Sequence, residues 1–284
     1  MKLVSFDSDG EPRPGLVADG KVIDLSPLYP SVNAIIAAGT AALERIGDLQ
    51  TGAGPSLESV RLRAPLVPRN IFCVGWNYLA HFEEGAAKRD EELPEHPAFF
   101  SKSLGTVVGP DEDVPAHEHV TSKLDYEVEL TVVFGTPGAD IPEDSAMEHV
   151  FGYTIGNDVS AREVQRRHGG QWVKGKSLDG TCPLGPWIVT RDEIPDPQKL
   201  DIGCRVNGEQ RQKSSTVRMI FPVADLVRRL SEGLTVGPGD IMLTGTPEGV
   251  AMGMDEPVWL KAGDVVQCEV SSIGVLRSKI VSSR

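Results

Sequence analysis

Short runs of alternating apolar and polar residues, separated by turn residues, make up most of this chain. The sequence contains 30 Gly and 21 Pro, and they divide it into many short β-prone runs rather than long helical ones. Asp-Gly pairs at residues 9–10 and 19–20 separate the first apolar runs, and such pairs are a strong signal of β-hairpins. The pattern predicts a mostly β protein with short helices, of the α+β class, whose first strands form a small sheet.

One segment near the N-terminus departs from this alternation. Residues 31–49 carry apolar positions at helical spacing but are interrupted by Gly39 and Gly47, so we expect one or two short helices there. Two prolines then precede the apolar run of residues 71–76, a composition typical of a linker. We therefore predict a small N-terminal domain over residues 1–65 and a larger domain over 66–284.

The segment LDYEVELTVVFG, residues 124–135, has the period of a β-strand with one buried face. The even-numbered positions from Tyr126 to Phe134 are all apolar, whereas Glu127 and Glu129 share the opposite face. Residues i and i+2 lie about 6.8 Å apart on a strand, so these two carboxylates can converge on one cation. The alternative is a solvated face, and this segment alone is compatible with both.

A third carboxylate, Asp158, follows the next strand-like run. Ser160 and Glu163 have the spacing of a capping box, which predicts a helix beginning directly after Asp158. Arg162 and Gln165 are three residues apart on that helix, so they share a face and can point back toward whatever Asp158 binds. A simple turn carboxylate is the other interpretation of Asp158.

Two further groups could take part in chemistry. Lys176 lies in a Gly-rich turn before a strand, where a surface lysine is the ordinary interpretation. His81 and Glu84 are three residues apart on a predicted short helix, so they form either a surface pair or a base with its orienting carboxylate. The charged segment of residues 81–97 is either a solvated connection or a lid over a site.

Composition narrows the class of protein. The chain has 284 residues, 40% of them hydrophobic, and 28 basic against 41 acidic residues give a net charge of -13, which disfavours nucleic acid and anionic membranes as partners. No run of 18 or more apolar residues and no apolar leader occurs, so we expect a cytoplasmic protein. The four cysteines show no CxxC spacing, so we expect reduced, buried thiols and no thiolate zinc site: Cys73, Cys182, Cys204 and Cys268.

Five motifs, in order across about residues 70 to 255, give the chain a resemblance to a known family. They are NYLAHFEEG, LDYEVELTVVFG, GYTIGNDVSAREVQ, KGKSLDGTCPLGP and GDIMLTGTPEGVAMG. Together they resemble the motif set of the fumarylacetoacetate hydrolase family, in the bacterial branch described variously as ureidoglycolate lyase, diketo-deoxysugar-acid hydrolase or hydroxyheptadienedioate isomerase. The resemblance implies a rolled, mixed β-sheet catalytic domain, a small N-terminal domain and a homodimer.

The resemblance also implies a divalent cation held by Glu127, Glu129 and Asp158. Three carboxylates without imidazole or thiolate form a hard oxygen site, which favours Mg²⁺, then Mn²⁺, with Ca²⁺ possible. It further assigns water activation to His81 with Glu84, and a positive charge near the reacting carbonyl to Lys176. The substrate contacts that it implies are Tyr78, Arg162, Gln165, Gly245 and Thr246. One departure is KSLDGTCP, where many relatives read KSFDTFCP.

The function that this implies is metal-dependent hydrolysis of a carbon-carbon bond in a 2,4-dioxo acid, either an acylpyruvate or a diketo-deoxysugar acid, through a metal-stabilised enolate. Oxaloacetate decarboxylation, and isomerase or lyase chemistry on a 2-oxo acid, are alternatives at the same site. A metal-binding homologue without turnover is a third class. Fold alone does not choose among them.

Overall fold

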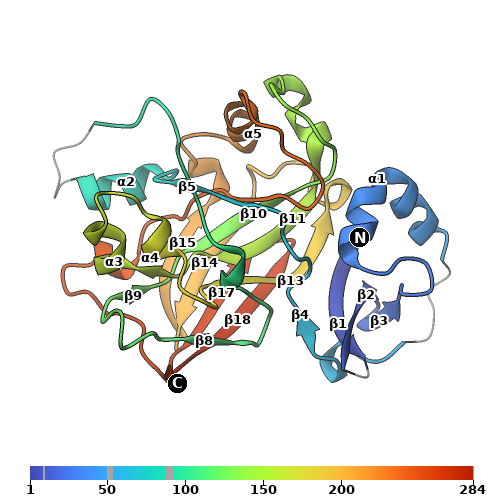
Figure 1. Ribbon diagram of the computed structural model, residues 1–284, viewed down its shortest axis with the longest axis horizontal. Helices are drawn as coiled ribbons and strands as arrows, with labels where there is room; N and C mark the ends of the chain where they lie inside the picture. The colour runs from blue at the N-terminus through green and yellow to red at the C-terminus, as the bar shows by residue number, and fades with distance from the viewer. Residues whose placement is uncertain (9, 50–53, 87–91, 284) are drawn as a thin grey trace.

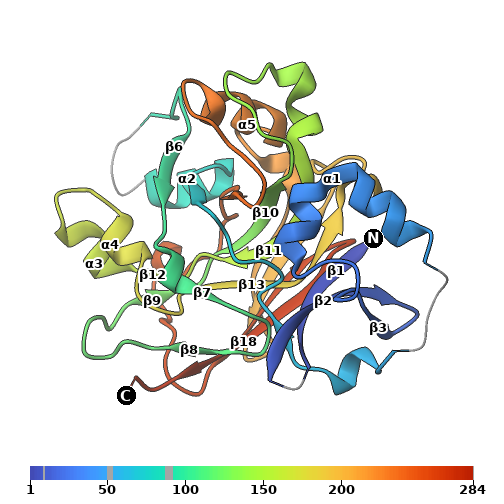
Figure 2. The ribbon, with the colours of Figure 1, turned by 45° about the vertical axis from the view of Figure 1, so that its right-hand side comes forward.

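The computed structural model describes residues 1–8, 10–49, 54–86 and 92–283. It consists mainly of β-strands with short helices, as the alternation predicts, and the strands form two large sheets and one two-stranded ribbon. Figures 1 and 2 show the N-terminal strands at one end of the molecule and the short helices α2, α3 and α4 at the other.

The larger sheet has eleven strands within the described residues, in the order β3-β2-β1-β13-β11-β10-β16-β5-β6, with β4 beside β1 and β7 beside β13. Its strands are β1 (Lys2–Ser8), β2 (Glu11–Ala18), β3 (Lys21–Asp24), β4 (Leu62–Arg63), β5 (Ile71–Gly75), β6 (Ala98–Ser101), β7 (Val107–Val108), β10 (Val128–Phe134), β11 (Val150–Asn157), β13 (Cys182–Thr190) and β16 (Ile241–Leu243). Most pairs are antiparallel, but β16 with β5 and β13 with β7 are parallel. The predicted mixed sheet is confirmed.

A five-stranded sheet contacts the larger one. Its order is β15 (Glu209–Ser215), β14 (Asp201–Val206), β17 (Val265–Val270), β18 (Gly274–Val281) and β8 (Asp113–Pro115). The even-numbered side chains of β10, such as Leu130 and Val132, share a core cluster with Ile202 of β14 and Val266 of β17. Burial of each such side chain stabilises the fold by about 1.5–3 kcal/mol, so the strand alternation fixes which face of β10 is core.

The N-terminal strands extend the larger sheet rather than forming a sheet of their own, so that expectation is wrong. β1 pairs with β13 through Lys2 with Val189 and Leu3 with Ile188. Helix α1 (Val32–Gly47) is broken at Gly39, which has a φ of 60°, as the interrupted periodicity predicts. The domain boundary near residue 65 stays a prediction.

The remaining elements are short. The α-helices after α1 are α2 (Leu79–Ala86), α3 (Arg162–Arg167), α4 (Val173–Lys176) and α5 (Val223–Ser231). The 3-10 turns are η1 (Leu57–Ser59), η2 (Leu104–Thr106), η3 (Glu143–His149), η4 (Arg191–Glu193), η5 (Thr216–Arg218) and η6 (Ala251–Gly253). Across the described ranges, none of the helices is both long and apolar enough to traverse a bilayer. The middle of the suggested lid, residues 87–91, lies outside the described residues.

The predicted strand over residues 124–135 is interrupted in the middle. It consists of β9 (Leu124–Asp125), which pairs with β12 (Ser160–Ala161), and then β10. Between them the backbone N–H of Tyr126 donates to Asp125 Oδ1 at 3.0 Å, and that of Glu127 donates to Asn157 Oδ1 at 3.0 Å. Side-chain acceptors therefore replace the ladder hydrogen bonds there, and this local competition is absent from the apolar pattern.

Candidate active site

Three carboxylates meet where β10 begins and β11 ends. Glu127 directly precedes β10, Glu129 lies within it and Asp158 directly follows β11. The antiparallel pairing of Glu129 with Gly156 brings these chain segments together. One ligand atom from each of the three side chains lies within 4.8 Å of the other two, and all three residues are buried. The charged face of this strand therefore does not meet solvent.

Two buried lysines bind these carboxylates. Lys176 Nζ donates to Glu127 Oε2 and to Asp158 Oδ2, the latter at 2.6 Å. Lys102 Nζ donates to Asp158 Oδ1 at 2.7 Å and to the carbonyl oxygen of Val159 at 3.2 Å. Lys176 is the last residue of α4 and is buried, so both its placement in a turn and its interpretation as a surface lysine were wrong. Sequence reasoning missed Lys102, which follows the apolar run of β6 and belongs to none of the five motifs.

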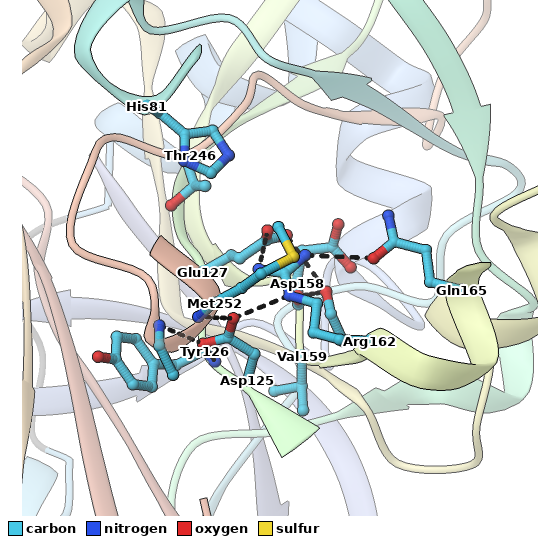
Figure 3. A network of polar contacts seen from close by, with 12 residues as sticks. His81, Asp125, Tyr126, Glu127, Asp158, Val159, Arg162, Gln165, Thr246 and Met252 are labelled. Atoms are coloured by element: carbon cyan, nitrogen blue, oxygen red, sulfur yellow. Dashed lines mark hydrogen bonds and ion pairs between the residues drawn. The ribbon is translucent and has the colours of Figure 1, made fainter. Parts of the chain in front are cut away.

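Arg162 extends this charge network, as Figure 3 shows. Its Nη2 donates to Glu127 Oε1 at 2.6 Å, its Nε donates to Asp125 Oδ2 at 2.8 Å, and its Nη1 donates to Gln165 Oε1 at 3.3 Å. Asp125, also missed from sequence, accepts the backbone N–H of Met252 at 3.1 Å. Arg162 thus donates to two carboxylates and one amide oxygen at the floor of the site.

The predicted capping box at the start of α3 is wrong. Ser160 lies in β12, and its hydroxyl donates to the carbonyl oxygen of Asp158 at 2.8 Å and to Glu127 Oε2 at 3.3 Å. Glu163 instead accepts a hydrogen bond from the Thr121 hydroxyl at 3.2 Å. Ser160 therefore supports the carboxylate cluster rather than the helix.

Glu127 and Glu129 differ in their electrostatic surroundings. Burial opposes ionisation of Glu127, but Arg162 and Lys176 outweigh it and lower the pKa of that carboxyl. Burial, followed by the charges of Asp158 and Glu127, raises the pKa of Glu129 well above its usual value. Glu129 accepts the backbone N–H of Gly245 at 2.7 Å, and no basic side chain in the described ranges pairs with it. Three buried oxygen donors with a negative charge left unbalanced fit a divalent cation.

A cavity of about 210 Å³ opens above this cluster. Glu127, Glu129, Arg162 and Lys176 contribute to its charged floor. Three aromatic side chains form one wall: Trp76, Phe100 and Trp172. The Trp76 and Trp172 ring centroids are 4.7 Å apart and those of Phe100 and Trp172 are 5.3 Å apart, both in edge-to-face geometry. A cavity of this size with a cationic and anionic floor is suited to a small acid.

His81 lines the same cavity from helix α2. Its Nδ1 lies 2.7 Å from Glu84 Oε1, and Glu84 Oε2 accepts the backbone N–H of Gly249 at 3.0 Å. Glu84 is therefore fixed at both oxygens and orients the imidazole, so that Nε2 is the nitrogen left for a reacting group. This is the geometry of an oriented general base.

Some of the five predicted substrate contacts line the cavity and others do not. Arg162, Gln165 and Thr246 line the cavity. Gly245 contributes its N–H to Glu129, and the Thr246 hydroxyl donates to the carbonyl oxygen of Val128 at 3.0 Å. Tyr78 is fully buried and is not among the cavity-lining residues. Its hydroxyl has no hydrogen-bond partner among the described residues.

Comparison with curated proteins gives close relatives. The chain is 47% identical over 227 residues to oxaloacetate tautomerase YisK of Bacillus subtilis (strain 168), covering 79% of this chain and 74% of the relative. It is 39% identical over 293 residues to the mitochondrial oxaloacetate tautomerase fahd2 of Xenopus laevis, covering 99% of this chain and 90% of the relative.

A solved structure and a family model also match this chain. Maleylpyruvate hydrolase from Sphingobium sp. SYK-6, in complex with manganese(II) ion and pyruvate, superposes with a TM-score of 0.84 at 27% sequence identity, and 100% of each chain is covered. Residues 70–281 match the model of the fumarylacetoacetate (FAA) hydrolase C-terminal domain. With the fold, the carboxylate cluster and these matches in agreement, the chain belongs to the fumarylacetoacetate hydrolase family.

Proposed function

We propose that the protein is a metal-dependent tautomerase that interconverts the keto and enol forms of a small 2-oxo acid, with oxaloacetate as the first substrate to test. The observation that carries this proposal is the buried carboxylate triad with the Lys176 ammonium beside it, of which Glu127, Glu129 and Lys176 line a small cavity. The names of the two tautomerase relatives, at 47% and 39% identity, support it. Hydrolysis, the function expected from the sequence, becomes the second candidate.

Glu127, Glu129 and Asp158 are the residues that would hold the cation. Bound there, a divalent ion supplies a Lewis acid that draws electron density from the 2-oxo group of the substrate. An all-carboxylate donor set favours Mg²⁺ or Mn²⁺ and accommodates Ca²⁺.

Tautomerisation transfers one proton between carbon 3 and the oxygen on carbon 2, without water and without breaking a carbon-carbon bond. We assign removal of the carbon 3 proton to His81 Nε2, because Glu84 orients the imidazole and stabilises the imidazolium that forms. The C–H electron pair becomes the C2–C3 double bond, the oxygen on carbon 2 gains negative charge, and that oxygen then takes the proton back from the His81 imidazolium, which returns the imidazole to its neutral form.

Lys176 stabilises that developing charge. Burial disfavours its ammonium, but Asp158 and Glu127 outweigh burial and raise the pKa of Lys176, which favours its cationic form. A fixed positive group in a water-poor site stabilises an oxyanion strongly. Lys176 and His81 therefore take opposite roles, one holding charge and one moving a proton.

Hydrolysis of a 2,4-dioxo acid is the second candidate, and the oriented His81 imidazole favours it. The same Nε2 could deprotonate a water for attack on the distal carbonyl, after which the C–C bond breaks and the electrons pass into a pyruvate enolate. The maleylpyruvate hydrolase relative supports this alternative. Decarboxylation of oxaloacetate shares that enolate but needs no attacking water.

The test is to transfer enol-oxaloacetate into buffer with Mg²⁺ and enzyme, and to follow loss of enol absorbance by stopped flow. Pyruvate release from oxaloacetate and from a panel of 2,4-dioxo acids is measured in parallel. The proposal expects fast enol loss with little pyruvate. Rapid pyruvate release from a dioxo acid, with no acceleration of enol loss, would transfer the assignment to hydrolysis, and no turnover at all would leave a metal-binding homologue.

The assembly and the location stay proposals as well. We propose a homodimer, as the family resemblance implies, and light scattering of the purified protein tests it. The cytoplasmic location remains a prediction from the sequence.

A further inference from the structure

Three basic side chains at the cavity differ in what they bind. Arg162 pairs with Asp125 and Glu127, and Lys176 pairs with Glu127 and Asp158. Arg166 also lines the cavity, but its Nη2 contacts Met252 Sδ at 3.0 Å, and no carboxylate in the described part of the chain pairs with it. A thioether is only a weak acceptor. The guanidinium of Arg166 is therefore the cation in the cavity wall that can bind an anionic ligand without first breaking an ion pair.

The position of Arg166 relates it to the floor of the site. It lies four residues after Arg162 on α3, so the two share one face of the helix, with Cβ atoms about 5–6 Å apart. Arg162 is buried, whereas Arg166 is exposed. The pair thus extends from the carboxylate cluster to the rim of the cavity, a reach comparable with that of a short diacid.

The net charge of the cavity floor can be balanced by one substrate carboxylate. The charged groups of the network are the carboxylates Asp125, Glu127, Glu129 and Asp158 and the basic Lys102, Arg162 and Lys176. With a divalent cation bound and all four carboxylates ionised, one positive charge remains. The carboxylate next to the 2-oxo group balances it, so a second carboxylate needs a cation elsewhere.

We propose that Arg166 binds this second carboxylate and makes the enzyme selective for dicarboxylic 2-oxo acids; the proposal rests on the proposed function, whose substrate class it narrows. The planar guanidinium donates two parallel hydrogen bonds to a carboxylate. The wall of Trp76, Phe100 and Trp172 offers no charge to that group, so Arg166 also orients the acid along the cavity. It is a specificity-determining residue that touches the far end of the substrate.

The experiment compares two unreactive 2-hydroxy acids that differ only at the far end: malate, with a carboxylate, and 2-hydroxybutanoate, with a methyl group. Binding to the Mg²⁺-loaded protein is measured by calorimetry for wild type, Arg166→Gln and the control Arg167→Gln. Arg167 is the adjacent exposed residue of α3 and does not line the cavity. We expect Arg166→Gln to weaken malate binding by about 10-fold, the scale of one charge-assisted contact, and 2-hydroxybutanoate binding by less than about 2-fold. Arg167→Gln should change neither.

Two further readouts keep the outcomes distinct. Arg166→Lys should recover part of the preference for malate, and thermal unfolding should show that each variant is folded. In oxaloacetate tautomerisation, Arg166→Gln should raise KM while kcat stays nearly constant, because the contact is remote from the transferred proton. If wild type binds malate more tightly but Arg166→Gln weakens both acids equally or neither, the role of Arg166 is refuted and the proposed function stands. If wild type binds neither acid, this inference is refuted, and the stopped-flow assay of enol loss decides the proposed function separately.

Discussion

The floor and the aromatic wall of the cavity are built on different physical principles. On the floor, Glu127, Asp158 and Lys176 are buried charges whose burial is tolerated because each has an oppositely charged partner. Removal of one partner from a buried pair costs about 3–5 kcal/mol, since the other charge is left uncompensated. The wall is held by ring packing, in which an aromatic pair contributes about 0.5–1.5 kcal/mol beyond burial. The floor therefore fixes the chemistry, and the wall is free to vary with the substrate.

The largest effect should come from removal of a cation ligand on the floor. Glu129→Gln is expected to lower Mg²⁺-dependent tautomerisation by about 10³-fold or more. The variant loses a ligand of the cation, and electrostatic stabilisation of a developing oxyanion is usually the largest single contribution to catalysis. Treatment of wild type with a chelator should do the same, with recovery on adding Mg²⁺. Steady-state rates and calorimetric Mg²⁺ binding check it. Full activity in metal-free wild type would remove the cation from the mechanism.

Replacement of a paired carboxylate and of an unpaired one should have different effects on the free energy of unfolding of the apoprotein. Asp158→Asn leaves Lys102 and Lys176 without one partner each, so we expect the free energy of unfolding of the apoprotein to fall by about 3–5 kcal/mol. Glu129→Gln removes a carboxyl whose ionisation is opposed by burial and by the neighbouring carboxylates, and which pairs with no basic side chain among the described residues, so the apoprotein should be as stable as wild type or more so. Urea denaturation in chelator measures both. Equal losses would show that the two carboxylates are not electrostatically distinct.

Replacement of the base on the cavity wall should matter unequally among reactions. His81→Ala is expected to slow tautomerisation, and any hydrolysis of dioxo acids, by about 10²-fold, the contribution of a positioned base. Decarboxylation of oxaloacetate should fall much less, because it needs no proton abstraction. Lys176→Met should damage all three, because each passes through negative charge on the same oxygen. Rates of the three reactions with each variant decide this, and a uniform loss in His81→Ala would reduce its role to positioning.

Binding of Mg²⁺ should release a proton, because Glu129 holds one more tightly in the apoprotein than in the unfolded chain. A raised carboxyl pKa stabilises the fold at low pH, so this contribution is lost as the pH rises through the folded pKa. Conversely, Mg²⁺ affinity should fall by up to about tenfold per pH unit below that pKa. Calorimetry in buffers of different ionisation enthalpy measures the proton, and Glu129→Gln should abolish its release.

The smallest effect should come from the aromatic wall. Trp172→Leu removes two edge-to-face contacts, so we expect the free energy of unfolding to fall by about 1 kcal/mol. The variant should also gain turnover of bulkier 2-oxo acids. Val173→Ala is the matched control, since Val173 is the adjacent exposed residue and the first of α4. Urea denaturation and kcat/KM for a small and a bulky acid test this. Loss of all activity with Trp172→Leu would place the wall in the chemistry rather than in selectivity.

Strand periodicity predicts the mostly β fold and places Glu127 and Glu129 on one face of a strand, whereas their grouping with Asp158 is what the family resemblance implies. The alternation from Tyr126 to Phe134 identifies the core face, and its charged face carries the acids that the fold brings to Asp158. Lys102 and Asp125 could not be predicted this way. Their roles arise from contacts with residues up to 127 positions away, as in the bond from the Met252 N–H to Asp125, and single charged residues carry no periodic signal. Ser160 was misassigned for the related reason that its hydroxyl had two possible local partners.

The pairing of β1 with β13 has a consequence for how the protein reaches this structure. Lys2 and Leu3 are synthesised long before their partners Val189 and Ile188. The hairpin of β1 and β2 can form early because its contacts are local, but closing such a long intervening segment carries a high entropic cost and slows folding. On the ribosome, the hairpin of β1 and β2 must wait with one edge exposed until residues 188 and 189 have been made. A pause or truncation before residue 188 would therefore leave an unpaired strand edge available to another nascent chain.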